Sequence, residues 1–179
     1  LDAILSAYIE KQKTAREIKT PEIAGLVADG VPLGEHALAG ALRFYARGEL
    51  EDGPVADAIL RRYLEAAFVT HKATKKLLSK GEYDVVVLNH GIYVPQGVIA
   101  ETARKLGVRV VTWHPAYRKQ CFIFSHNETY HHSLMSEPVS AWENALWTDK
   151  HVAHINDYLR SRWVGKQDWV KFHNNPELD

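Results

Sequence analysis

Only one cysteine, Cys121, occurs among the 179 residues. A single cysteine excludes an internal disulfide, so the fold has to rest on a hydrophobic core, which a chain of this length can build. It also favours a reducing compartment, and we expect a cytoplasmic protein. No apolar run approaches the roughly 18 residues of a membrane span, and no signal-peptide pattern opens the chain. A peripheral contact with a membrane stays open.

An excess of charge of one sign is also missing. Lys plus Arg number 22 and Asp plus Glu number 22, so the formal net charge is zero. This balance argues against a nucleic-acid-binding protein, because such proteins carry an excess of positive charge. The sequence contains no GxGxxG, P-loop or GxSxG pattern. We therefore expect neither nicotinamide or nucleoside triphosphate chemistry nor a covalent hydrolase, and no cofactor.

Helical patterns dominate the first 80 residues. The predicted helices cover residues 1–14, the segment from Thr20-Pro21-Glu22 to about Gly30, residues 35–46, and residues 54 to about 79. The Thr-Pro-Glu sequence is a helix start signal, and Gly81 is a typical stop. Residues 1–80 are therefore expected to form a helical part without a convincing strand.

The hydrophobic period changes at residues 84–88, a continuous β-branched run typical of a strand buried on both faces of a parallel sheet. A helix is predicted from Pro95 and a second strand at 108–112, joined by a right-handed crossover. We expect an α/β fold with a partial Rossmann-like parallel sheet and helices covering it. Its parts are a helical segment (1–80), a parallel βαβ core (81–138) and C-terminal helices (139–179).

Aromatic residues are frequent towards the C-terminus. A third strand is predicted at 120–125, one long helix with a broad apolar face at about 140–163, and a further turn or two of helix at 166–172. Four tryptophans are interpreted mainly as core and docking residues: Trp142, Trp147, Trp163 and Trp169. Trp113, at a strand end, is a candidate to stack on a sugar ring.

Polar residues follow both strands of the predicted parallel pair. In an open parallel sheet, ligands bind beyond the carboxyl ends of the strands. This rule selects Asn89, His90, Gly91, Trp113, His114, Pro115, Tyr117, Arg118 and Lys119. The helix starting near Pro95 points its amides and positive dipole end at the same region, so an anion is expected there. In the alternative interpretation these residues only cap a turn and form a solvated loop.

A second polar segment reads Ser-His-Asn-Glu-Thr-Tyr-His-His at 125–132. We expect it to lie as a loop at the rim of the same cleft, with His126 and Tyr130 contacting substrate. The alternative is a solvated loop in which Asn127 or Thr129 caps a helical turn. The histidines have no HExxH spacing, so no metal is expected. His90 has an ordinary pKa of about 6.5 and suits a general base.

Three motifs together resemble a known family. They are Val-Val-Val-Leu-Asn-His-Gly-Ile-Tyr-Val-Pro-Gln-Gly at 85–97, Ala-Arg-Lys-Leu-Gly-Val at 103–108, and the aromatic, polar loop at 113–119. Their order resembles the N-terminal, acceptor-side domain of GT-B glycosyltransferases, especially enzymes of bacterial surface or capsular polysaccharide biosynthesis. The resemblance implies transfer of a sugar from a nucleotide-sugar to an acceptor hydroxyl, with His90 as base. His114, Arg118 and Lys119 would contact anionic groups.

The resemblance also implies a second, nucleotide-binding domain, for which this sequence shows no pattern. The first strand of the family and its Gly-rich turn are also missing. We therefore expect a fragment of a longer two-domain protein, inactive alone, whose partner is the C-terminal domain of the same chain. Two alternatives stay open. One is a metal-dependent hydrolase using His90, His114, His126 and His132, and the other is a non-catalytic module that docks a partner through its Trp-rich end.

Overall fold

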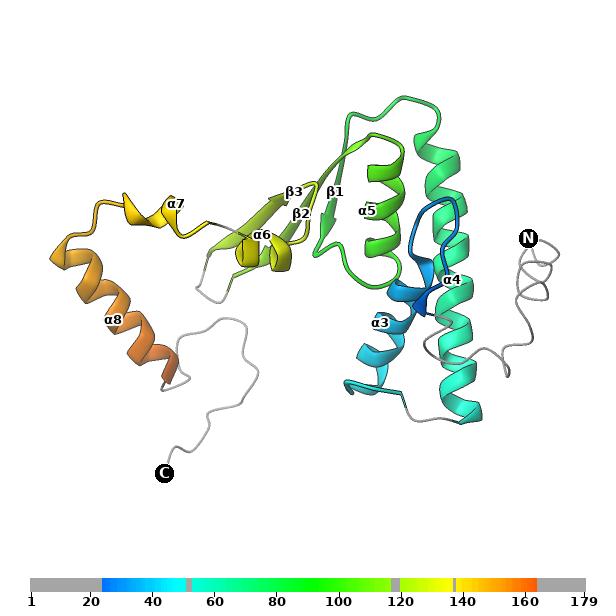
Figure 1. Cartoon of the computed structure of the whole chain (residues 1–179), viewed down its shortest axis with the longest axis horizontal. Coiled ribbons are helices and arrows are strands. Elements are labelled where there is room, and N and C mark those ends of the chain that lie inside the picture. Colours follow the sequence, from blue (N-terminus) through cyan, green and yellow to red (C-terminus); the bar gives the residue numbers. More distant parts are fainter. Residues whose placement is uncertain (1–23, 51–52, 117–119, 137, 164–179) are drawn as a thin grey trace.

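The computed structural model describes residues 24–50, 53–116, 120–136 and 138–163. In chain order its elements are α3 (Leu33–Tyr45), α4 (Pro54–Leu78), β1 (Val85–Asn89), α5 (Gln96–Lys105), β2 (Arg109–Pro115), β3 (Phe122–His126), α6 (Tyr130–Ser136), α7 (Ser140–Glu143) and α8 (Asp149–Trp163). Figure 1 shows α3, α4 and α5 gathered beside the sheet. The helices predicted at 1–14 and 166–172 lie outside the described residues.

The segment before α3 is a turn, so the helix expected to reach Gly30 ends earlier. Ala28 and Val31 exchange two backbone hydrogen bonds of 3.0 and 2.9 Å. Asp29 and Gly30 between them both have positive φ, 52° and 77°. Asp-Gly is a preferred pair for a tight turn with positive φ at both central positions, and this local preference overrides the helix pattern.

Helices α3 and α4 form the main core. Gly40 of α3 allows a close approach, because a Cβ there would lie 2.6 Å from the ring of Tyr63 on α4. The buried residues of this core are Val31, Leu33, Ala37, Ala41, Leu60, Leu64, Ala67, Phe68 and Val98. Val98 belongs to α5, so the helical part and the crossover helix share one core.

The sheet has three strands in the order β1-β2-β3. Strand β1 pairs parallel with β2, and β3 pairs antiparallel with β2. Helix α5 connects β1 to β2 and packs against both strands, with Leu78, Ala100, Ala103 and Val110 buried between them. The predicted α/β fold with a partial Rossmann-like sheet is therefore confirmed, and the third strand makes the sheet mixed.

Among the described residues, elements cover only one face of the sheet, so the prediction that the first strand is buried on both faces is wrong. Val110, Thr112 and Ser125 are buried on the face where α5 and α6 lie. Val87 and Phe124 are exposed on the other face. A β-branched run indicates a strand, but which of its faces is buried depends on elements elsewhere in the chain.

The single helix predicted at 140–163 is also wrong, since α7 and α8 are separated by residues 144–148. Thr148 and His151 cap α8 reciprocally: the His151 amide donates to Thr148 Oγ1 (3.4 Å), and the Thr148 amide donates to His151 Nδ1 (3.3 Å). Trp142, Trp147 and Trp163 are exposed rather than part of a core. Trp169 lies outside the described residues, and within those residues no helix has the length and apolar character to cross a membrane.

Candidate functional site

The carboxyl ends of β1 and β2 are held together by Asn89 and His90. The backbone amide of His90 donates to the carbonyl oxygen of Trp113 at 2.9 Å. The side-chain amide of Asn89 donates to the same oxygen at 3.3 Å. The Asn89 side chain therefore holds the two strand ends together. This agrees with the alternative interpretation, in which the residue caps the turn and does not contact substrate.

The turn after β1 depends on left-handed backbone conformations. His90, Gly91 and Tyr93 have φ values of 44°, 72° and 63°. Gly91 is buried, and a Cβ at this position would lie 2.6 Å from Cγ2 of Thr112. The prediction that Gly91 permits a turn that a side chain would block is confirmed by this geometry.

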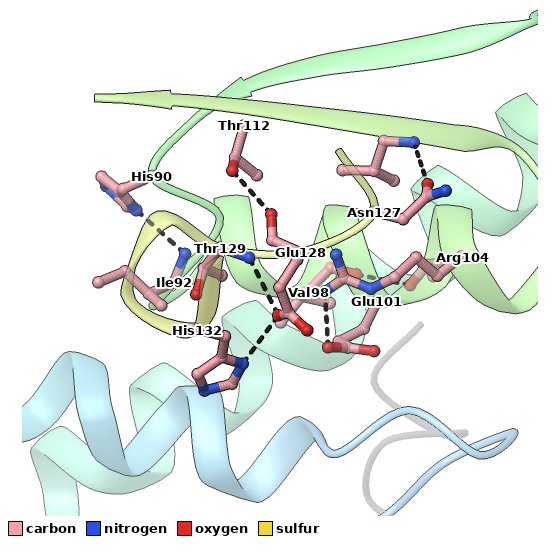
Figure 2. A network of polar contacts seen from close by, with 12 residues as sticks. His90, Ile92, Val98, Glu101, Arg104, Thr112, Asn127, Glu128, Thr129 and His132 are labelled. Atoms are coloured by element: carbon pink, nitrogen blue, oxygen red, sulfur yellow. Dashed lines mark hydrogen bonds and ion pairs between the residues drawn. The ribbon is translucent and has the colours of Figure 1, made fainter. Parts of the chain in front are cut away.

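The His90 ring accepts a hydrogen bond from its own turn. The backbone amide of Ile92 donates to His90 Nδ1 at 3.1 Å (Figure 2). An occupied Nδ1 places the proton of the neutral ring on Nε2, so the outer nitrogen of His90 is a donor. The Tyr93 ring meets His90 edge to face, with centroids 5.4 Å apart.

His114 has the opposite arrangement. Its Nδ1 lies 2.7 Å from the carbonyl oxygen of Pro115, which can only accept, so Nδ1 carries the proton. The Nε2 atom of the neutral His114 ring then has a free lone pair. The Tyr130 ring lies against His114 with centroids 4.6 Å apart, and His131 lies against Tyr130 at 3.8 Å. Helix α6 thus brings Tyr130 to the strand ends. The loop expected at 125–132 is wrong in part, because Ser125 and His126 belong to β3 and Tyr130, His131 and His132 belong to α6.

Two histidines of this site, His90 and His131, resist protonation. Burial lowers the pKa of His90 most, and the charge of Arg43 and the neighbouring His114 and His131 lower it further. Burial is also the largest cause that lowers the pKa of His131, followed by His114 and His132. Neighbouring rings therefore oppose protonation of His90 and His131, and these two rings are uncharged at neutral pH.

One positive charge reaches the site from helix α3. The Arg43 guanidinium lies 4.9 Å from the centroid of the Tyr93 ring, a cation–π distance. A shallow hollow beside this pair is lined by Ala39, Leu42, Arg43, Ala46, Arg47 and Tyr93. At the α5 N-terminus, where an anion was expected, the Gly97 amide already donates to the Tyr93 carbonyl oxygen at 2.7 Å. Among the described residues, Arg43 and Arg47 line this hollow and supply positive charge that would attract an anion here.

A separate polar network fixes the segment between β3 and α6 (Figure 2). Glu128 Oε1 accepts from the Thr129 amide (3.0 Å) and from His132 Nδ1 (2.8 Å). Burial would raise the pKa of Glu128, but these hydrogen bonds and the charge of Arg104 lower it below its ordinary value. The Thr112 hydroxyl donates to the Glu128 carbonyl oxygen at 2.8 Å. His132 is therefore engaged in holding α6 in place.

Several predicted residues do not join the site. His126 is exposed and pairs with Val111, so the antiparallel course of β3 takes it away from His114 and the carboxyl end of β2. Tyr117, Arg118 and Lys119 lie outside the described residues. Within the described ranges no three His, Cys, Asp or Glu side chains are placed to hold a metal ion. The metal-dependent hydrolase therefore has no geometric support in this part of the chain.

Three residues of the site were missed by the sequence reasoning: Arg43, Tyr93 and His131. Tyr93 lies in the turn after the first strand, so the strand-end rule could have included it. His131 stands in the polar segment already selected, and its ring lies against Tyr130 because both residues belong to α6. Arg43 lies on α3 and reaches the site only through tertiary packing, so no local signal points to it.

No protein-family model, curated protein or solved structure matches this chain.

Proposed function

We propose that this chain is the acceptor-side domain of a GT-B-like glycosyltransferase. It would work in the cytoplasm with a nucleotide-binding domain, transferring a sugar from a nucleotide-sugar to an acceptor hydroxyl in polysaccharide or glycan biosynthesis. The observation that carries the proposal is the pair of histidines at the ends of adjacent parallel strands. The hydrogen bonds of His90 leave it a donor, and those of His114 leave it an acceptor.

Such a pair matches the needs of a hydroxyl group, which donates one hydrogen bond and accepts others. Tyr93 and Tyr130 border the two histidines and offer ring surfaces of the kind on which sugars lie. Arg43 adds a positive charge suited to the phosphate of a donor. The lowered pKa of His90 keeps its ring neutral at pH 7, with the proton on Nε2 available for donation.

The hydrogen bonds divide the roles between the two rings. His114 Nε2 would take the proton from the acceptor hydroxyl, while the His90 Nε2–H would hold an oxygen of the same substrate. The sequence favours His90 as base, and this stays a prediction. For His90 to act so, its proton would have to leave Nε2, and moving it to Nδ1 would break the hydrogen bond from the Ile92 amide.

The test is sugar transfer by the complete gene product, assayed with a panel of nucleotide-sugars and acceptors. We expect His114→Ala to lower kcat by at least about 100-fold, the low end of general-base effects. His90→Asn suits the left-handed backbone and can still accept from Ile92, but it loses the outer donor. His90→Gln can place an amide donor near the Nε2 position and should retain more activity than His90→Asn.

His126→Ala is the matched control, because His126 is exposed at the far end of the β2–β3 pair. It should transfer sugar at nearly the normal rate. Near-normal turnover by both His90→Ala and His114→Ala would exclude this site as the acceptor site. A loss in His90→Ala together with normal turnover in His114→Ala would return the base role to His90.

A further inference from the structure

Within the described ranges, one apolar face of the sheet has no element packed on it, and it lies opposite the face that α5 and α6 cover. We call it the bare sheet face. Val87 and Phe124 on it are 58% and 61% exposed. The register places Val87 beside Val111 and Trp113 beside Phe124, so these four side chains form a continuous strip across all three strands. Continuous apolar strips of this kind mark surfaces that bind another structural element.

A second bare apolar face runs along α8. Val152, Ile155, Leu159 and Trp163 follow one another at intervals of three or four residues and form one stripe of the helix. Leu159 and Trp163 are 56% and 83% exposed, and no residue of α8 is buried. An isolated helix of 15 residues is marginal in water, so its stability has to come from packing of this stripe.

The two faces fit each other in size. The 15 residues of α8 span about 22 Å at about 1.5 Å per residue. The seven residues of β2 span about 23 Å at about 3.3 Å per residue. One α8 helix laid along the strands would therefore span the bare sheet face, and its apolar stripe would cross the Val87–Phe124 strip at Val111 and Trp113.

The course of the chain decides which copy supplies the helix. Helix α6 lies on the covered face, because Glu128 bonds to Thr112 and Tyr130 contacts His114 on that side. From there α7 and α8 lead away from the sheet (Figure 1). To reach the bare face of its own sheet, the chain would have to reverse and pass around strand β3. The sheet of a second molecule requires no such reversal.

We propose that two copies of this chain form a reciprocal dimer in which α8 of each copy packs on the bare sheet face of the other. Each copy gives one helix and receives one, so the contact is closed and symmetric. Both apolar faces are then covered, and the histidine site on the opposite side of the sheet stays accessible. The dimer is independent of the proposed glycosyl transfer.

The first test is the molar mass of the 179-residue chain, measured by sedimentation and light scattering from about 1 to about 200 μM. The unchanged chain should be dimeric at the upper end of this range. Ile155→Asp in α8 and Phe124→Asp on the sheet should each give monomers. Val55→Asp is the matched control, because Val55 is 66% exposed on α4, away from both faces, and it should leave the dimer intact. Circular dichroism melts of each variant check that it is folded.

The second test mixes the two monomeric variants. Ile155→Asp keeps an intact sheet face and Phe124→Asp keeps an intact helix, so one of the two contacts can form between them. A heterodimer should appear in the mixture, although neither variant dimerises alone. A monomeric unchanged chain at every concentration, a dimer that survives both substitutions, or a mixture without heterodimer would each overturn the proposal.

Discussion

At the scale of single residues, backbone groups next to each ring decide what the histidines of the site can do. The Ile92 amide occupies Nδ1 of His90, and the Pro115 carbonyl receives the proton on Nδ1 of His114. Both partners are fixed by the local course of the chain. The division into donor and acceptor therefore persists as long as the two strand ends keep their geometry.

Gly91 maintains that geometry. We expect Gly91→Ala to lower the free energy of unfolding by about 1–3 kcal/mol, because a Cβ would be strained at a positive φ and would also meet Thr112. Chemical denaturation measures the loss. Gly48→Ala is the control, since nothing lies within 4 Å of a Cβ there. Adding Thr112→Ser removes the methyl group and should recover part of the loss, whereas an unchanged stability in Gly91→Ala would contradict the explanation.

The strand-end rule predicts part of this site from the sequence alone. It selects His90, Gly91 and His114 because a β-branched run followed by polar residues is visible without any structure. It cannot assign the hydrogen bonds of the rings, which depend on angles in the turn. It also cannot supply Arg43, which approaches only because α3 packs against α4 and α5.

At the scale of elements, buried His71 joins three separate parts of the fold. It lies on α4 and is 1% exposed. Its Nδ1 is 2.9 Å from the Thr102 hydroxyl on α5, and its Nε2 is 3.0 Å from a carboxylate oxygen of Asp29 in the turn before α3. Lys75 also binds Asp29, at 2.8 Å, and helps to hold the pKa of that carboxyl well below its ordinary value. These hydrogen bonds of His71 hold α4 against α5 and against the turn before α3.

We expect His71→Leu to lower the free energy of unfolding by about 1–3 kcal/mol, because it removes both bonds at a buried position. Urea denaturation followed by circular dichroism gives the value. Lys76→Ala, at an exposed position of the same helix, should change stability by less than about 0.5 kcal/mol. Equal effects of the two substitutions would show that the His71 bonds add no net stability.

Elements with a strong local signal were predicted correctly, and the errors have physical causes. Helices α3, α4 and α5 and all three strands lie within a few residues of their predicted ranges, because apolar periodicity and Gly or Pro boundaries define them. The break between α7 and α8 was missed because histidine at position 151 replaces the acidic residue usual in a capping box. The bare sheet face was missed because burial depends on which elements return to cover a strand.

At the scale of the whole molecule, stability should depend on the protonation of buried histidines. His36 is 7% exposed, and burial is the largest cause that lowers its pKa, with nearby Arg104 lowering it further and Glu35 and Glu101 raising it. The pKa values of His90 and His131 are lowered as well. In the unfolded chain these rings take up protons near pH 6.5, while the folded state resists protonation to lower pH.

Stability is therefore expected to be complete above about pH 6.5 and to fall as the pH drops towards the folded pKa values, by up to about 1.4 kcal/mol per pH unit for a buried histidine such as His36. Asp29 and Glu128 have lowered pKa values, so their stabilising contribution is lost only below about pH 4. Urea unfolding between about pH 7.5 and about pH 5 separates the two ranges. His36→Leu should flatten this dependence, and an identical slope in the variant would exclude His36 as a cause.

The packing order of the elements has a consequence for how the protein is made. Helix α4 packs against α3, α5 against α4, β2 against β1 and β3 against β2. From α4 to α6, each element therefore contacts an element that lies one or two places earlier in the chain, except β1, which pairs with the later strand β2. Short sequence separations between contacts favour rapid folding. Each segment that emerges from the ribosome already finds its neighbour in place, so the α3-to-β3 body can fold before the α8 helix has left the ribosome.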